Sequence, residues 1–562
     1  MFLLGAPARA GDNPPAPPVA AAPWSWTGFY AGAHAGGLFG TTTFSDPDGP
    51  PLYGGTVSSP GFLAGVQLGY NHQIAPQWVV GLEADASWLT AMGSNTCLQS
   101  SVTIVGSNCK VTPRALGTVA GRVGFVTAPH GRTLLYGRAG VAWMRADVSM
   151  NPNNVPHLDQ GFINNGFTFT DTPDQGDPTS ASLTSWGPTV GAGVEYALSS
   201  AWSLKMQYDY MHFGGLSVPT PQTTDVTING QVTNLPSSGF SSVTQDFHAV
   251  RLGLNYRFGV GSGRAGADGS AAYGAAAPPA APWVAGWDID VGLRYWYSSG
   301  SFQTANGAPN ILVSRLTYDG VTGHSGELHA RVDTPFDVFF KGFVGGGSLA
   351  TGNMYDEDWG LSSNLAAVPT SYEVTQSNIS GSLFYLTADL GYNVMRGRDH
   401  KVGLFVGYNR YETTMNAMGC AQLVQPASEV CFPASPTSTN VISEFDTWQS
   451  LRLGVSAEAR IWDRFTISGD FAWLPYVKYD GLDIHRLRNL SFPVQGTGRG
   501  GQAEIILSYQ PIESFSIGVG GRYWTMWTDN ASQTDSPSNV FEVETQRYGV
   551  FVQATYRFKA PR

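Results

Sequence analysis

Charged residues are scarce in this chain, since Asp, Glu, Lys and Arg make up only 13% of its 562 residues. Acids outnumber bases among them, and the net charge of −11 disfavours nucleic acid as a partner. Long apolar runs are missing too, because no stretch reaches the roughly 18 residues that a membrane-spanning helix needs. The sequence therefore excludes an α-helical membrane protein.

Glycine and aromatic residues are abundant instead, with 69 Gly, 16 Trp, 24 Tyr and 29 Phe. The apolar side chains are dispersed by alternation. In the segment from Trp202 to His212, large apolar residues occupy every second position and polar residues lie between them. The same alternation occurs from Phe62 to Asn71 and from His248 to Phe258. Alternating runs of about 9 to 11 residues or longer are typical of strands that span a membrane as a β-barrel.

Short and long connections alternate along the chain. Ala128 to Gly131 and Ser199 to Ala201 are short, whereas Asn151 to Ser182 is long and polar. Short turns on one side and long loops on the other are typical of bacterial outer-membrane barrels. We therefore expect an all-β protein that is integral to the bacterial outer membrane and surrounded by its lipid.

The strand pattern divides into two parts. About eight strands fit between Trp24 and Phe258, and about ten fit between Trp287 and Phe558. Residues 259–284 between them are rich in Gly, Ala and Pro, as expected of a flexible linker. We predict two antiparallel transmembrane barrels in tandem, at residues 24–258 and 285–558.

Both parts begin after a Pro-Trp pair and end on nearly the same strand, Asn255–Phe258 and Thr555–Phe558. A single barrel of about eighteen strands is the alternative, but it leaves these two closing strands and the linker unexplained. An even number of strands also returns the ends of each barrel to one side of the membrane, which places the linker in the periplasm.

The terminal segments are short. Residues 1–10 contain a small-x-small cleavage pattern at Ala8-Arg9-Ala10 and are predicted to be the end of a signal peptide, with an ordinary disordered leader as the alternative. Residues 11–23 form a Pro- and Ala-rich leader, and residues 559–562 form a tail after the last strand.

The four cysteines form two close pairs, Cys97 with Cys109 and Cys420 with Cys431. We expect both pairs in long outer loops, where neighbouring cysteines of an exported chain form disulfide bonds. Metal binding is the disfavoured alternative, because neither spacing resembles CxxC and no histidine sits beside either pair. No metal or other cofactor is expected.

The inward-facing positions of the first predicted barrel carry charges of both signs. A barrel of about eight strands is only wide enough for side chains to fill it. We expect these charges to neutralise one another and to fill the lumen, so that no diffusion pore remains. The residues are Glu83, Arg122, Arg138, Glu195, Lys205, Asp209 and Arg251.

Two triplets in the second predicted barrel carry most of the functional information. Asp356 and Asp358 flank Glu357, and Asp483 and His485 flank Ile484. Residues i and i+2 of a strand share a face, so each triplet offers a pair to the lumen at the loop end of its strand. Such pairs can hold and deprotonate a water, because a carboxylate orients the imidazole and raises its basicity. Solvated loop acids or a weak calcium site are the alternative.

Similar motifs elsewhere weaken the signal from spacing alone. Asp46 with Asp48 and Asp288 with Asp290 repeat the DxD pattern, and Asp246 with His248 repeats DxH. The four candidate catalytic residues differ from these copies only in their expected position at the outer rim of a barrel.

The segments WTGFYAGAHAGG, GVQLGYNHQI, YGRAGVAW and VRLGLNYRFG resemble the small immunogenic, porin-like outer-membrane proteins of α-proteobacteria. This resemblance covers about residues 24–258. It implies an outer-membrane barrel that contributes to surface structure and names no chemistry.

The second half resembles another family. The stretch ending in GGGSLATGNMYDEDW, the later FAWLPYVKYDGLDIH and the closing YGVFVQATYRF are similar to the omptin outer-membrane proteases in content and order. The resemblance implies a ten-stranded barrel that cleaves peptides at the cell surface, without a covalent intermediate. It assigns Asp356 and Asp358 as the catalytic aspartate pair, His485 as the general base and Asp483 as its orienting partner.

The chain also departs from that family. Omptins that cut between basic residues carry an acid where Gly481 stands, and a second acid near Gly300 is missing. Only Arg410 echoes the basic positions that bind lipopolysaccharide, so dependence on that lipid is an open expectation. A non-catalytic structural or adhesive surface protein is the alternative function. A channel is a third and weaker one.

Overall fold

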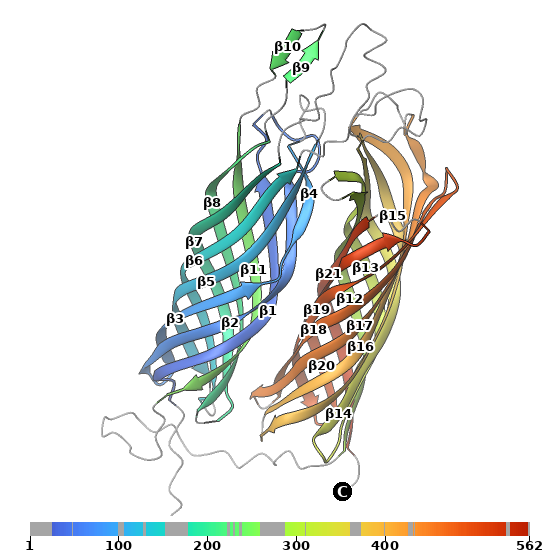
Figure 1. Ribbon diagram of the computed structural model, residues 1–562. Coiled ribbons are helices and arrows are strands. Elements are labelled where there is room, and N and C mark those ends of the chain that lie inside the picture. The colour runs from blue at the N-terminus through green and yellow to red at the C-terminus, as the bar shows by residue number, and fades with distance from the viewer. Residues whose placement is uncertain are drawn as a thin grey trace, which may run out of the picture.

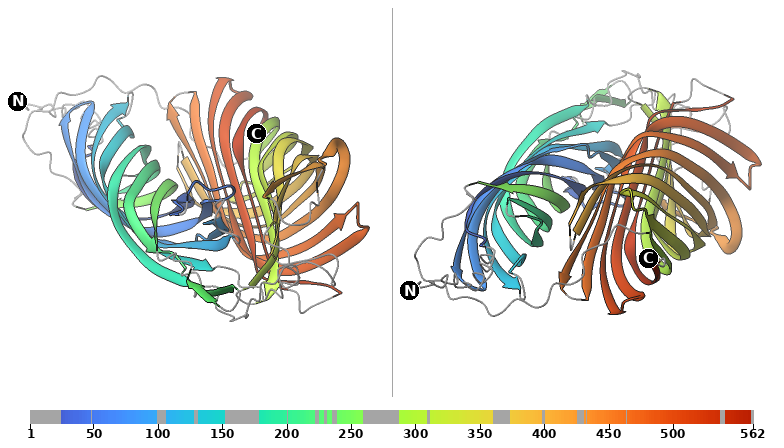
Figure 2. Two further views of the ribbon diagram at one scale, coloured as in Figure 1. Left: turned by 90° about the horizontal axis from the view of Figure 1, so that it is seen from above. Right: turned by 90° about the horizontal axis from the view of Figure 1, so that it is seen from below.

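The computed structural model describes residues 25–47, 49–98, 106–127, 131–151, 178–199, 201–221, 225–228, 231–234, 239–258, 287–308, 311–359, 373–397, 400–424, 431, 433–462, 464–535 and 540–559. These residues form two separate β-barrels that stand side by side (Figures 1 and 2). The predicted signal-peptide end, leader and linker lie outside the described residues, as does the tail apart from Lys559. Among the described residues, no helix is long and apolar enough to cross a membrane.

The first barrel is a ring of eight antiparallel strands that closes between β3 and β5. Strand β4 continues the line of β3 along β5, and β9 and β10 form a small separate hairpin beyond the rim (Figure 1). The strands of this half are β1 (Gly28–Phe44), β2 (Thr56–Ala75), β3 (Trp78–Leu89), β4 (Gly93–Cys97), β5 (Ser107–Thr127), β6 (Thr133–Asn151), β7 (Thr179–Ala197), β8 (Trp202–Pro219), β9 (Asp225–Ile228), β10 (Gln231–Asn234) and β11 (Phe240–Arg257).

The second barrel is a closed ring of ten antiparallel strands in sequence order. The tandem prediction is therefore confirmed, and a single large barrel is wrong, because β1 pairs with β11 and β12 pairs with β21. The strands are β12 (Asp288–Ala308), β13 (Ile311–Asp333), β14 (Val338–Asp358), β15 (Glu373–Arg396), β16 (His400–Val424), β17 (Ser435–Trp462), β18 (Phe465–His485), β19 (Leu490–Ile512), β20 (Phe515–Gln533) and β21 (Val540–Lys559).

The predicted alternation sets the two faces of each wall. Val66 and Leu68 of β2 are more than half exposed on the outside, whereas Gln67 between them is buried in the lumen. Phe62 lies on the outer face by the same alternation, but it is only 7% exposed because it packs against Phe471 of the second barrel at 5.5 Å between ring centroids. Part of the apolar belt therefore faces the other barrel.

Ion pairs fill the lumen of the first barrel, as predicted. Glu83 is 1% exposed and is held by Lys205 Nζ at 2.7 Å, Arg138 Nη1 at 3.1 Å and Arg122 Nη1 at 3.5 Å. The network also includes Asp85, which the prediction lacked. Its members are four carboxylates and four cations: Glu83, Asp85, Glu195, Asp209, Arg122, Arg138, Lys205 and Arg251.

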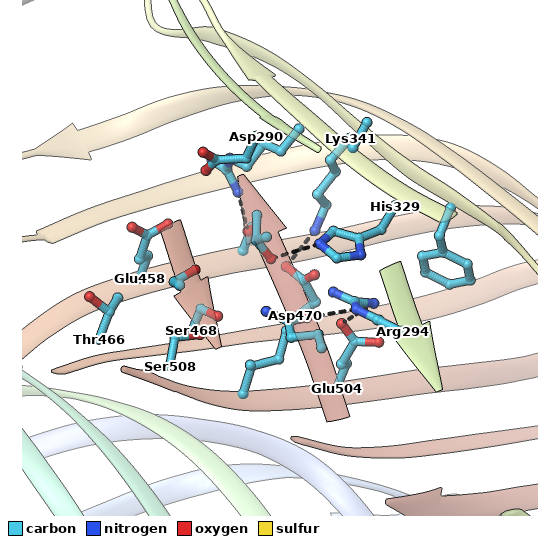
Figure 3. Close-up of a pocket in the computed structure, with 18 of the residues that line it drawn as sticks. Asp290, Arg294, His329, Lys341, Glu458, Thr466, Ser468, Asp470, Glu504 and Ser508 are labelled. Atoms are coloured by element: carbon cyan, nitrogen blue, oxygen red, sulfur yellow. Dashed lines mark hydrogen bonds and ion pairs between the residues drawn. The ribbon is translucent and has the colours of Figure 1, made fainter. Parts of the chain in front are cut away.

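The second barrel is filled differently at its two ends. Towards the short turns a polar pocket encloses about 160 Å³ between charged side chains such as Arg294, Lys341 and Glu504 (Figure 3). On the side of this pocket that faces the long loops, the ring of Trp524 contacts those of Trp296 at 5.0 Å and Tyr385 at 5.3 Å between centroids. This aromatic layer separates the pocket from the outer rim.

Both predicted disulfides are present, Cys97 with Cys109 and Cys420 with Cys431. Their expected setting in long loops was wrong in part, because the strands extend further than the hydrophobic pattern shows. Cys97 ends β4, Cys109 lies in β5 and Cys420 lies in β16, while Cys431 follows in a turn. The first disulfide thus links two paired strands at the outer end of the first barrel.

Candidate active site

Asp356 and Asp358 are among the last residues of β14, at the end of the barrel away from the short turns. The last strongly exposed apolar side chain on the outside of this strand is Val344, so both acids lie beyond the lipid-facing belt. Both are half-buried and share the lumen face, whereas Glu357 between them points outward and is fully buried. The ladder places Asp358 opposite Ser314 on β13.

Asp483 and His485 lie at the corresponding end of β18. His485 Nε2 is 2.9 Å from Asp483 Oδ2, and the His485 ring contacts Phe492 edge-on at 5.4 Å between centroids. Arg488 Nη2 is 2.6 Å from His485 Nδ1. A guanidinium only donates, so Nδ1 accepts this bond and Nε2–H donates to Asp483. The predicted aspartate-histidine couple is thus formed, and its other nitrogen is occupied by Arg488.

The two pairs face each other across the mouth of the barrel. Strands β14 and β18 are four places apart in a ring of ten, which puts them on opposite sides. Burial raises the pKa of Asp356 well above its usual range, and the charges of Asp358 and Asp483 raise it further. Burial also raises the pKa of Asp358, against the hydrogen bond from Ser314 and the charges of Arg488 and His485. These surroundings favour the protonated form of the aspartate pair.

Three further acids that the motifs did not reveal surround this site. Burial and the charge of Asp358 raise the pKa of Glu373, at the start of β15, to about 7. Glu444 and Asp446 lie on the lumen face of β17, and burial raises the pKa of Asp446 to about 7 and that of Glu444 well above its usual range. Glu444 and Asp446 are themselves two residues apart on one strand, and register shows that they reach the site, because Glu444 pairs with Asp483 and Asp446 with Gly481.

Register also explains Gly481. The Tyr479 ring lies over this glycine, and a Cβ there would come within 2.0 Å of the Tyr479 hydroxyl oxygen. That hydroxyl donates to Asp446 Oδ1 at 2.8 Å. The carboxylate missing from position 481 is therefore present on the neighbouring strand. At Gly300 a Cβ would come within 2.5 Å of the Gln546 carbonyl oxygen, so no side chain fits there either.

Several buried polar atoms in the mouth have no hydrogen-bond partner among the residues that the structure describes. They are Asp483 Oδ1, Glu444 Oε2, Tyr318 Oη and Trp448 Nε1. Buried polar groups are normally satisfied, so such a cluster suits water or a ligand. No group of three or more His, Cys, Asp or Glu side chains in the described part of the chain is arranged to hold a metal ion.

The repeated motifs lie elsewhere. Asp246 and His248 are on the outer wall of β11, where Tyr210 Oη donates to Asp246 at 2.6 Å. Asp290 lies at the short-turn end of the second barrel and pairs with Arg557 at 2.8 Å. Asp48 lies outside the described residues. Arg410 is on the outer wall of β16 and pairs with Glu412. Position therefore distinguishes the candidate site from its copies.

Comparison with known proteins gives a family match to the first half of the chain. The outer membrane protein beta-barrel domain matches residues 15–258. The 31 kDa outer-membrane immunogenic protein of Brucella melitensis is 30% identical over 273 residues, which cover 46% of this chain and 95% of that protein. The 22 kDa outer membrane protein of Rhizobium leguminosarum is 28% identical over 234 residues, covering 42% of this chain and 79% of that protein.

Among solved structures, the outer-membrane protease OmpT from Escherichia coli has a TM-score of 0.39 and 16% identity, covering 48% of this chain and 97% of that chain. Ail, the attachment invasion locus protein of Yersinia pestis, has a TM-score of 0.19 and 14% identity, covering 41% of this chain and 99% of that chain. The sequence matches and the two closed rings show that the chain belongs to the family of outer-membrane β-barrel proteins and is integral to the outer membrane.

Proposed function

We propose that the second barrel is an omptin-like endopeptidase that hydrolyses peptide bonds at its extracellular mouth. The observation that carries this proposal is the pairing of two half-buried aspartates on β14 with a hydrogen-bonded aspartate-histidine couple on the opposite strand. The unsatisfied polar atoms of this end of the barrel support a site that holds water or substrate.

The chemistry follows from the protonation states. Asp483 fixes the His485 ring through Nε2–H, so Nδ1 is the nitrogen that can accept a proton. Arg488 has to leave Nδ1 before a water can take its place. The water then gives its proton to Nδ1 and attacks the peptide carbonyl, while the protonated aspartate pair stabilises the developing oxyanion and supplies a proton to the leaving amine.

The surrounding acids favour peptides with basic side chains. Gly481 removes one acid, but Asp446 and Glu444 present carboxyl groups to the same part of the mouth. The pKa of Asp446 is about 7, so this carboxyl is largely neutral in mildly acidic solution and becomes charged above neutrality. The preference for basic residues therefore increases with pH.

The test is cleavage of a peptide library by the full-length protein refolded in detergent, with and without lipopolysaccharide. Wild type is expected to cleave, and Asp356→Asn and His485→Ala are expected to lose at least about 10²-fold in rate, the usual cost of removing an acid or base. His248→Ala is the matched control, because it alters the same motif on the outer wall of the first barrel. No cleavage by wild type, or equal loss in the control, would reject the proposal.

Comparing cleavage with and without lipopolysaccharide tests whether the activity needs this lipid. Arg410, the one echo of a lipid-binding position, is already paired with Glu412. We therefore propose that cleavage needs no lipopolysaccharide, and a strict requirement for this lipid would contradict that part of the proposal.

The first barrel supports a different role. Its lumen is filled by balanced ion pairs, and its relatives are named as immunogenic or outer-membrane proteins. We propose that this half is a structural part of the cell surface rather than a second enzyme. If the wild-type protein cleaves no peptide, this surface role becomes the better account of the whole chain.

A further inference from the structure

The C-terminal end of β14 is held in place by contacts on the outside of the second barrel. Glu357 lies between the two candidate catalytic aspartates, so the alternation of the strand turns its side chain outward. It meets Arg315, its register partner on β13, with Nε to Oε2 at 2.7 Å and Nη2 to Oε1 at 3.1 Å. Arg315 is 1% exposed and Glu357 is 0% exposed. Complete burial on the outer wall of a barrel requires a cover.

The cover is the β4–β5 hairpin of the first barrel. Thr96 and Asn108 face each other on this hairpin. Asn108 Oδ1 accepts from Arg315 Nη1 at 2.9 Å, and the Thr96 hydroxyl is hydrogen-bonded to both Arg315 and Glu357. The Cys97–Cys109 disulfide adjoins both residues. One facing pair on the first barrel is thus docked onto one facing pair on the second.

Two further contacts flank this docking point. Trp359 Nε1 donates to the Gly106 carbonyl oxygen at 3.2 Å, and the rings of Tyr53 and Tyr355 lie 5.1 Å apart between centroids. A buried ion pair is tolerated only when its remaining polar atoms also find partners. The hairpin supplies those partners, and all of them act on the strand end that carries the aspartate pair.

We propose that the first barrel positions the catalytic carboxylates of the second. Thr96 and Asn108 hold Arg315 and Glu357 on the outer side of β14, which fixes Asp356 on the lumen side. This inference rests on the proposed endopeptidase function. Thr96 and Asn108 are positioning residues, since they touch neither the water nor the peptide. A displacement of about 1 Å at a reacting group can cost about 10²-fold in rate.

The test compares the full-length Thr96→Val/Asn108→Ala variant with wild type. We expect kcat to fall about tenfold while KM stays within about twofold, because the hairpin orients the acids without binding the peptide. Thr96→Ser keeps the hydroxyl and is expected to retain the wild-type rate. Lys110→Ala is the matched control, because it removes another contact of the same hairpin, the ion pair with Glu542 on β21 at 3.5 Å. An unchanged kcat in the double variant, or an equal fall in the control, overturns the proposal.

Amide hydrogen exchange supplies a measurement that needs no cleavage. In the double variant, exchange at residues 353–358 is expected to accelerate about tenfold, with no change at residues 479–485 on the opposite strand. Unchanged exchange at residues 353–358 overturns the positioning role. If wild type cleaves nothing while this acceleration occurs, the endopeptidase function fails and the docking of the hairpin on β14 stands.

Discussion

Replacing Glu83 with glutamine tests whether balanced charge holds the first barrel together. Glu83→Gln keeps the shape of the side chain but leaves three carboxylates facing four cations in the lumen. Glu83 contacts three of those cations at 2.7 to 3.5 Å and also accepts from Tyr30 Oη at 2.7 Å. Breaking a buried ion pair from one side costs about 3 to 5 kcal/mol, because the partner is left buried and uncompensated.

The assay is amide exchange of the full-length protein in detergent, read separately for peptides of each barrel. A loss of about 3 kcal/mol accelerates exchange through opening of the first barrel by about 10²-fold, while the second barrel serves as the internal control. Adding Lys205→Met to Glu83→Gln rebalances the charges and is expected to recover part of the loss. Acceleration below about fivefold, or no recovery in the double variant, would refute the view that charge balance stabilises this lumen.

Two further predictions concern the mouth of the second barrel. Arg488→Ala frees His485 Nδ1 and removes a cation that competes with basic peptides, so kcat/KM for such peptides is expected to rise several-fold. Arg486→Ala is the control. A fall in kcat/KM of the Arg488 variant would instead assign Arg488 a catalytic role. Asp446→Asn removes a carboxyl with a pKa of about 7, which is neutral below that pH and charged above it. Wild type is therefore expected to favour basic over neutral peptides increasingly between pH 6 and 8, and the variant should lose this increase; an unchanged pH dependence would contradict the assignment.

Much of the fold could be predicted because alternation is a local property. The alternation from Trp202 to His212 predicted a strand there, and in the structure this strand begins at Trp202 and continues to Pro219. The inward charges were found by the same period of two. The short strand β4 was missed, because five residues are too few to show a period. Phe62 shows another limit, since its position predicts an outward side chain but cannot tell lipid from a second barrel.

The site was only partly predictable for a related reason. Asp356, Asp358, Asp483 and His485 lie in two compact motifs, and each motif fixes its own pair through the pleat. Their neighbours Glu444 and Asp446 form another pair of acids two residues apart, but only the register of β17 against β18 places that pair beside the site. Arg488 reaches His485 from the turn after β18, where no periodic pattern applies.

The closing strand pair of the second barrel joins the two ends of that half of the sequence. The last residues of β21 pair with the first residues of β12, Lys559 beside Asp288, although all the other strands of the ring lie between them in the sequence. Contacts between such distant parts of a chain form slowly. The wall of the first barrel presents Phe39, whose ring lies 4.0 Å from that of Tyr523 on β20 and 6.2 Å from that of Tyr548 on β21. The wall of the first barrel therefore supports β20 and β21 beside the strand pair whose long-range contacts form most slowly, and fusion in one chain keeps that support close to the seam.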